Sequence, residues 1–275
     1  MPAPLAMPPA PPAPPVIGAP PVLTPAPMPA FNLLTGEPVI HLASGNQTYI
    51  ASTTPSYIYG NTGNDIINGG TSNLSTADYS TLRTAVTLGI GGVVTKGING
   101  ASGSDQLINI HTIVGAIGQN NTIDASTGST NNSVSIAVNL QTHDLQVKNI
   151  PGLGTLDFQV VNFNTVIGPN AADTFIGNNG NDTFVGGAGS TFTTGTGHNT
   201  LTGGGGLDTF NFGGGNDVIT NFNIAGGDVL NSHTKVNDIT DVQGGALVHF
   251  APGQSVMLVG INATDLIASH AIHII

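Results

Sequence analysis

The sequence predicts an all-β protein: a parallel β-roll or β-solenoid with short Gly/Asn/Asp turns, preceded by a proline-rich, non-globular arm. Three observations support this fold class. Glycine contributes 39 of 275 residues while charged residues make up 7%, against about 25% in typical soluble domains. The apolar residues are mainly small or β-branched, which suits thin layers of strands. A nine-residue repeat also recurs in the second half of the chain.

The arm comprises residues 1–30, where 13 of the 18 prolines lie. Proline fixes φ and removes an amide donor, so a polyproline II or disordered tail is expected. The alternative is an apolar arm that docks on a neighbouring subunit through residues such as Val16, Ile17, Val22 and Leu23. The prolines also interrupt any apolar segment that could serve as a cleavable signal peptide.

From Phe31 onward, short β-branched segments alternate with turn residues. We expect a β-solenoid with irregular coils over 31–160, a regular roll over 161–225 and a C-terminal β cap over 226–275. The clearest strands are 57–59, 66–67, 85–88 and 134–138, and the one short helix falls near 263–268.

Six polar residues mark the repeat, at successive spacings of 9, 8, 9, 9 and 9: Asp173, Asp182, Ser190, Asn199, Asp208 and Asp217. Two positions after each stands an apolar residue: Phe175, Phe184, Phe192, Leu201, Phe210 and Ile219. In a parallel β-roll, six residues of each nonapeptide form a turn and three form a strand. Each strand is therefore expected to bury one side chain between two sheets.

Segments 177–184, 203–210, 213–219 and 60–67 resemble the G-G-x-G-x-D-x-U consensus of RTX proteins, the secreted bacterial proteins with hemolysin-type calcium-binding nonapeptide repeats. Segments 110–124 and 163–173 resemble the variant turns that link RTX blocks. The tail from Asp217 to Ile275 is similar to the RTX C-terminal flank.

This resemblance implies Ca²⁺ between turns that lie two nonapeptides apart on one edge of the roll. Ca²⁺ takes six to eight oxygen ligands, here turn carbonyls and carboxylates. The expected ligands are Asp173, Asp182, Asn199, Asp208, Asp217 and Asp65. One edge carries Asp, Ser, Asp and the other Asp, Asn, Asp. Each gap, meaning the space between two successive turns on one edge, therefore has one aspartate where the consensus has two. We therefore expect weak sites, with Kd of roughly 10⁻⁴ to 10⁻³ M, or partly empty ones.

Two qualifications apply to these ligands. Asp65 stands alone, with no stacked partner visible in the sequence. The alternative to calcium is that ladders of Asn, Ser and Thr side chains, including Thr191, Thr193 and Thr196, hold the turns without metal.

The composition excludes several function classes. The chain has four cations, Arg83, Lys96, Lys148 and Lys235, whereas nucleic-acid binding needs a basic patch. No apolar segment approaches the 18 or so residues of a membrane span. With no cysteine, disulfides and thiolate metal sites are excluded.

No catalytic residue is predicted and we expect the protein not to be an enzyme. A nucleophile elbow, a zinc-protease helix and a P-loop are all absent. A β-helix carbohydrate-active enzyme could use Asp144 with Asp157, or Asp105 with Asp124, as acid and base. Nothing in the sequence selects these pairs, and four scattered cations suit a sugar carboxylate poorly.

Because strands and turns occupy the whole of 31–275, no room remains for a separate enzyme or toxin domain. We therefore expect a secreted calcium-binding structural protein that self-assembles as a homopolymer into an extracellular filament, sheath or surface layer. The resemblance further implies type I secretion through an uncleaved signal near Leu258–Ile275. The alternative is a monomeric extracellular adhesin or matrix protein that binds glycans at the cell surface.

Overall fold

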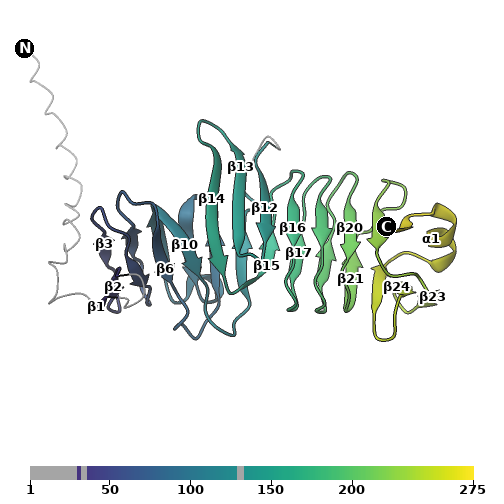
Figure 1. The fold of residues 1–275 in the computed structure, drawn as a ribbon, viewed down its shortest axis with the longest axis horizontal. Helices are drawn as coiled ribbons and strands as arrows, with labels where there is room; N and C mark the ends of the chain where they lie inside the picture. Colours follow the sequence, from purple (N-terminus) through teal and green to yellow (C-terminus); the bar gives the residue numbers. More distant parts are fainter. Residues whose placement is uncertain (1–29, 32–35, 129–132) are drawn as a thin grey trace, which may run out of the picture.

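The computed structural model describes the backbone of residues 30–31 and the whole of residues 36–128 and 133–275. Residues 1–29, and with them nearly all of the proline-rich arm, lie outside this part of the chain. The described residues form an elongated body of two 13-stranded sheets that run along its length (Figure 1). The predicted β-roll is confirmed.

The first sheet, sheet A, contains in spatial order β1 (Ala30–Phe31), β2 (Pro38–His41), β4 (Tyr57–Tyr59), β6 (Ser75–Asp78), β10 (Ile110–Val114), β14 (Gly154–Val161), β13 (Asp144–Ile150), β12 (Ser135–Asn139), β16 (Thr174–Ile176), β18 (Thr191–Thr193), β20 (Thr209–Phe212), β22 (Val229–Ser232) and β26 (Ile272–Ile274).

The second sheet, sheet B, contains β23 (Asp238–Val242), β24 (Gly245–His249), β25 (Ser255–Val259), β21 (Asn216–Thr220), β19 (Thr200–Thr202), β17 (Thr183–Val185), β15 (Phe163–Ile167), β11 (Asn121–Asp124), β7 (Val86–Gly89), β8 (Val93–Lys96), β9 (Ser104–Ile108), β5 (Ile66–Asn68) and β3 (Thr48–Ile50). A regular coil adds one strand to each sheet. Two 3₁₀ turns, η1 (Ile90–Gly92) and η2 (Ile98–Gly100), flank β8.

The strands expected near 57–59, 66–67, 85–88 and 134–138 are present as β4, β5, β7 and β12. The short helix is α1 (Ala263–Ser269), capped by the Asn262 side chain. The segments that resemble linking turns contain solenoid strands, namely β10, β11 and β15. Within the described part of the chain, no helix is long and apolar enough to cross a bilayer.

Three antiparallel insertions interrupt the parallel stacking, and the sequence did not predict them. They are β7–β8–β9 in sheet B, β12–β13–β14 in sheet A and β23–β24–β25 at the C-terminal end of sheet B. The β13–β14 hairpin stands out from the body (Figure 1). Each insertion lengthens the sequence between coils that still stack on each other.

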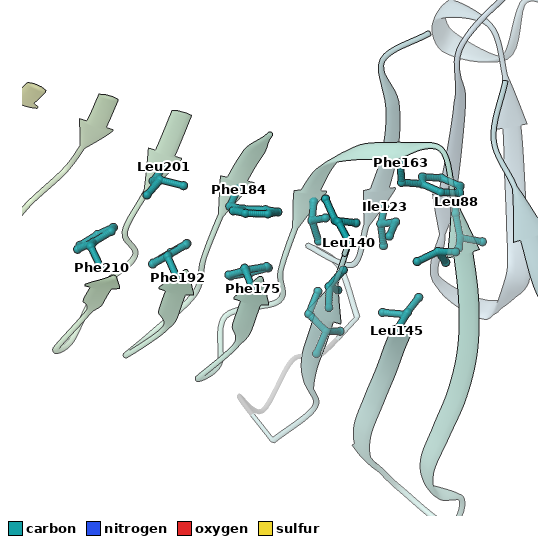
Figure 2. Packing of buried hydrophobic residues seen from close by; sticks show 14 of the residues in the cluster. Leu88, Ile123, Leu140, Leu145, Phe163, Phe175, Phe184, Phe192, Leu201 and Phe210 are labelled. Carbon is teal, nitrogen blue, oxygen red and sulfur yellow. The ribbon is translucent and has the colours of Figure 1, made fainter. Parts of the chain in front are cut away.

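Inside the roll, one apolar side chain per strand fills the space between the sheets. Phe192 stacks between Phe175 and Phe210, with ring centroids 5.1 and 4.8 Å apart, and Phe184 faces Phe175 from the other sheet at 5.3 Å (Figure 2). All four rings are buried. Stacked aromatic pairs add to the stability that burial provides, so this column of rings stabilises the stacking of each coil on the next.

Glycines in the turns allow successive coils to approach closely. A Cβ on Gly195 would lie 1.7 Å from the carbonyl oxygen of Asn178, and one on Gly197 would lie 1.9 Å from that of Gly180. The turns therefore stack with backbone against backbone, one coil apart. Carbonyl oxygens of one turn face the backbone of the next.

The close approach predicts a sharp contrast between two Gly→Ala variants in the roll. Gly195→Ala should destabilise the roll by about 1–3 kcal/mol, because its methyl overlaps a backbone carbonyl. Gly205→Ala has nothing within 4 Å of its Cβ and should change stability by less than about 0.5 kcal/mol. Thermal unfolding followed by circular dichroism measures both, and equal melting temperatures would contradict the stacking of these turns.

Candidate calcium-binding turns

The polar residues that end each turn stack into two columns. The first turn column precedes strands of sheet A and consists of Asp173, Ser190, Asp208 and Asp228. The second turn column precedes strands of sheet B and consists of Asp182, Asn199 and Asp217. Turns about one coil apart therefore lie over one another, which is the arrangement on which the calcium prediction depends.

A hydrogen-bond ladder joins neighbouring members of each column. The backbone N–H of one coil donates to the side-chain oxygen of the next: Ser190 to Asp208 at 2.7 Å, Asp208 to Asp228 at 2.8 Å, Asp182 to Asn199 at 2.9 Å and Asn199 to Asp217 at 2.9 Å. Each rung needs an acceptor and no charge. Serine and asparagine can therefore replace aspartate in the ladder.

The other carboxylate oxygen lacks such a partner. Five buried carboxylate oxygens accept no hydrogen bond: Asp65 Oδ2, Asp173 Oδ2, Asp182 Oδ1, Asp208 Oδ2 and Asp217 Oδ2. All five side chains are at most 2% exposed. A buried, unpaired carboxylate oxygen is costly, and carboxylate and carbonyl oxygens are the ligands that Ca²⁺ prefers. The donor set in these turns therefore fits Ca²⁺.

The acidity of these groups reflects the same environment. Burial raises the pKa of Asp173 to about 7, against the opposing effect of backbone hydrogen bonds. Burial likewise raises the pKa of Asp182 and of Asp217 to about 6. The pKa of Asp208 is also raised, first by burial and then by the neighbouring charge of Asp228. Without a cation, the fold disfavours the ionised form of each carboxylate.

One gap is richer in charge than expected. The Asp208–Asp228 gap contains two aspartates and lies beyond the turns predicted from the sequence, whose gaps each have one aspartate. Asp228 also accepts the N–H of Asn223 at 2.7 Å. The sequence signal was weak because Asp228 follows Asp208 by 20 residues, two more than the repeat period. Ca²⁺ affinity rises with ligand charge, so this gap is the strongest candidate in the roll.

The Asn199–Asp217 gap is partly satisfied without metal. The Asn199 amide donates to Asp217 Oδ1 at 2.9 Å and to the Gly197 carbonyl at 3.3 Å. Outside the column, the Thr196 hydroxyl donates to Asn179 at 3.2 Å and Asn211 donates to Thr193 at 3.2 Å. The polar ladders of the alternative interpretation therefore coexist with the buried carboxylates.

Asp65 is not alone, and that expectation is wrong. Its N–H donates to Asp105 Oδ1 at 3.0 Å, and its Oδ1 accepts the N–H of Gln47 at 2.8 Å. The β7–β8–β9 insertion separates Asp65 from Asp105 by 40 residues, which hides the pair from a search at the repeat period. The ammonium of Lys96 lies 3.6 Å from Asp65 Oδ2.

Side chains alone do not complete any of these sites. In residues 36–128 and 133–275, no group of three or more His, Cys, Asp and Glu side chains gathers as a metal site. A bound Ca²⁺ would therefore take most of its oxygen ligands from turn carbonyls, as the sequence resemblance implies.

The two carboxylate pairs considered for catalysis lie outside the turn columns. Asp144 and Asp157 lie on β13 and β14, where Gln159 donates to Asp144 at 2.5 Å and Gln146 donates to Asp157 at 2.8 Å. Hydrogen bonds from Thr142 and Gln159 lower the pKa of Asp144, which disfavours a general acid.

The second carboxylate pair lies apart. Asp105 and Asp124 belong to β9 and β11, with β8 and β7 between them. A cavity of about 860 Å³ is lined mainly by aliphatic side chains, and neither Arg83 nor Lys96 lies in its wall.

Comparison with known families finds the RTX calcium-binding nonapeptide repeat (4 copies) in residues 43–73, 163–192 and 191–219. These segments contain all six predicted ligands. The chain therefore carries RTX repeats, which bind calcium. A solved structure with similarity is the extracellular lipase LipA from Serratia marcescens, at 15% identity and a TM-score of 0.28.

The alignment with the lipase covers 87% of this chain and 43% of the lipase. The chain thus spans less than half of the lipase's length, and a likeness this weak carries no conclusion about activity. No curated protein matches the chain.

The raised pKa values predict a pH dependence of the metal-free protein. An unfolded aspartate titrates near 3.8, whereas Asp173, Asp182 and Asp217 titrate at about 6 to 7 in the fold. Between these values the folded state binds more protons, so the free energy of unfolding falls as pH rises. In EDTA the melting temperature at pH 8 should lie at least about 5 °C below that at pH 5. Millimolar Ca²⁺ should remove most of this difference.

The variant that tests this prediction is Asp173→Asn. Its amide oxygen can still accept the N–H of Ile136, which donates to Asp173 Oδ1 at 2.9 Å in the parent chain. It should show a smaller loss of stability between pH 5 and pH 8 in EDTA, and a smaller Ca²⁺ response. Asp157→Asn, at an exposed position, should leave both unchanged. A melting temperature that is independent of pH and of Ca²⁺ would contradict the proposed role of these carboxylates.

Proposed function

We propose that this chain, with its calcium-binding RTX repeats, is an extracellular structural protein that self-assembles end to end into a filament, sheath or surface layer. The observation that supports assembly is the architecture itself: a continuous two-sheet solenoid whose terminal strands leave edges unpaired within the described residues. No catalytic role is proposed.

The N-terminal end offers such an edge in sheet B. β3 is the last strand there and pairs with β5 alone. Its sequence, Thr48–Ile50, has no charge, and Ile50 is 67% exposed. Soluble β proteins usually protect edges with lysine, proline or a covering segment. An uncharged, apolar edge is a template for pairing with another chain.

The C-terminal end offers a second edge in sheet A. β26 is the last strand there and pairs with β22, and Ile274 and Ile275 are both more than half exposed. The helix α1 packs against β23 and β24 in the other sheet, so it covers a different part of this end. Contact between unlike ends is heterologous, and such contacts generate filaments when they do not close into a ring.

Bound calcium would favour assembly by neutralising part of the chain's negative charge. The net charge of −11 repels copies of the chain from each other, and Ca²⁺ bound in the turns reduces that repulsion. Weak sites load at the millimolar calcium of extracellular fluids. Calcium would therefore promote both folding of the roll and association of its ends.

A monomeric, glycan-binding adhesin is the second candidate, supported by the β13–β14 hairpin. Its outward face carries alternating carboxylates and amides, formed by Asp144, Gln146, Asp157 and Gln159. Such a row of hydrogen-bonding groups suits sugar hydroxyls. The same hairpin also borders a depression that His111 lines.

The assembly proposal predicts a variant contrast between two equally exposed isoleucines. Ile50→Lys places a charge on the terminal strand β3, whereas Ile117→Lys, also 67% exposed, places it on a turn between β10 and β11 in the middle of the solenoid. Ile50→Lys should reduce concentration-dependent light scattering in millimolar Ca²⁺ by roughly tenfold, because a desolvated charge opposes strand pairing. Ile117→Lys should scatter like the parent chain, and electron microscopy should show filaments or sheets for both the parent and Ile117→Lys.

A deletion of residues 1–29, which keeps β1, tests whether the proline-rich arm bridges subunits. Shorter or fewer assemblies are expected. Monodisperse monomers of the parent chain at every protein and Ca²⁺ concentration would reject assembly and favour the adhesin.

Extracellular location predicts that the C-terminal region carries an export signal. Deleting 258–275 is a poor test because it removes the last two of the five residues of β25, including Leu258, which pairs with Ile219 of β21. Residues 226–275 fused to a passenger protein should instead direct that passenger to the medium of a host with a type I exporter. The same passenger fused to 163–219 is the matched control, and equal amounts outside the cell would refute the signal.

A further inference from the structure

Lys96 occupies an unusual place for one of four cations in the chain. It ends β8, the middle strand of the β7–β8–β9 insertion, and its side chain is 0% exposed. Its ammonium lies 2.5 Å from the carbonyl oxygen of Asn61 and 2.5 Å from Asp105 Oδ1. Asp65 Oδ2 is 3.6 Å away. The ammonium is thus held among three oxygens from three separate residues.

These oxygens are of the kind that the RTX turns use for calcium. Asp65 closes the repeat copy at 60–65, inside the family match at 43–73. Asp105 is the stacked aspartate of the next coil, since the Asp65 N–H donates to it. Asn61 supplies a carbonyl from the same turn as Asp65. With two aspartates in the gap, this turn pair has the full consensus charge, which most gaps of the roll lack.

The surrounding side chains close this gap. The Tyr79 hydroxyl donates to Asp105 Oδ2 at 2.9 Å, and the Tyr79 ring lies 6.0 Å from the ammonium. Tyr79 is fully buried, and the missing Cβ of Gly60 leaves room for its ring, which would otherwise lie 2.3 Å away. The insertion, the tyrosine and the glycine together enclose the Lys96 ammonium, whose side chain is 0% exposed.

We propose that the Lys96 ammonium takes the place of Ca²⁺ in the Asp65–Asp105 gap. The N-terminal coils then form without metal, whereas the gaps between 173 and 228, which contain no lysine or arginine, depend on Ca²⁺. Removal of the Lys96 charge is expected to reveal a calcium site that the parent chain does not have. This inference is independent of the assembly proposed above.

The test compares Lys96→Met, which keeps the apolar stem and removes the charge, with the parent chain. Hydrogen exchange is measured for 57–79 and for 173–217, in EDTA and in millimolar Ca²⁺. In the parent, EDTA should accelerate exchange in 173–217 and leave 57–79 unchanged. In Lys96→Met, exchange in 57–79 should accelerate on the order of 100-fold in EDTA, because two buried carboxylates lose their cation. Ca²⁺ should restore protection there, with one additional Ca²⁺ bound per chain in equilibrium dialysis.

Two further variants keep the outcome interpretable. Lys148→Met, on β13, should behave like the parent. Lys96→Met combined with Asp105→Asn has one buried carboxylate fewer and should stay protected over 57–79 in EDTA with no additional Ca²⁺. If Lys96→Met is unprotected in both EDTA and Ca²⁺ while the double variant is protected, Lys96 is a counter-ion that Ca²⁺ cannot replace and the proposal fails. Loss of protection over 57–79 in the parent in EDTA would also overturn it.

Discussion

The rest of this structure depends on the contact between the last residue of one turn and the same residue one coil later. A backbone N–H donates to a side-chain oxygen in the following coil, as Ser190 does to Asp208 and Asp182 does to Asn199. Parallel strands lie about 4.8 Å apart, so the polar residues of a column, most of them aspartates, are forced close together. The same contact that orders the turns therefore concentrates buried negative charge along them.

Two other features make this stacking achievable. Gly195 and Gly197 have no side chain to hold the turns apart, so successive turns can approach closely. Inside the roll, the stacked phenylalanines around Phe192 set the distance between coils. Insertions do not disturb the register, since they add antiparallel strands within a sheet and return the chain to the stack. Asp105 thus lies over Asp65 although 40 residues separate them.

The sequence predicted what repeats at a constant period. The strands of the roll, its inward phenylalanines and four of the five aspartates with a buried unpaired oxygen follow from nonapeptide spacing, and the fifth, Asp65, follows from an isolated copy of the motif. It did not predict the antiparallel insertions, because alternating apolar residues, as in β13, fit either strand direction. It also missed Asp228 and Asp105, since a longer turn in one case and an inserted hairpin in the other shift them from the period.

Lys96 was missed for a related physical reason. A lysine next to Gly97 on an apparently ordinary strand has no sequence feature that marks it as buried, and its partners become visible when the coils are stacked. Along this one solenoid, the buried aspartates of the turns therefore have three kinds of neighbour. Asn199 is a neutral amide that donates to Asp217, Lys96 is a tethered ammonium between two aspartates, and the Asp208–Asp228 gap has neither. Since an uncompensated buried charge is the costliest of these arrangements, dependence on calcium should increase from the lysine-filled gap to the Asp208–Asp228 gap, and the C-terminal end of the roll is where calcium has most control over folding.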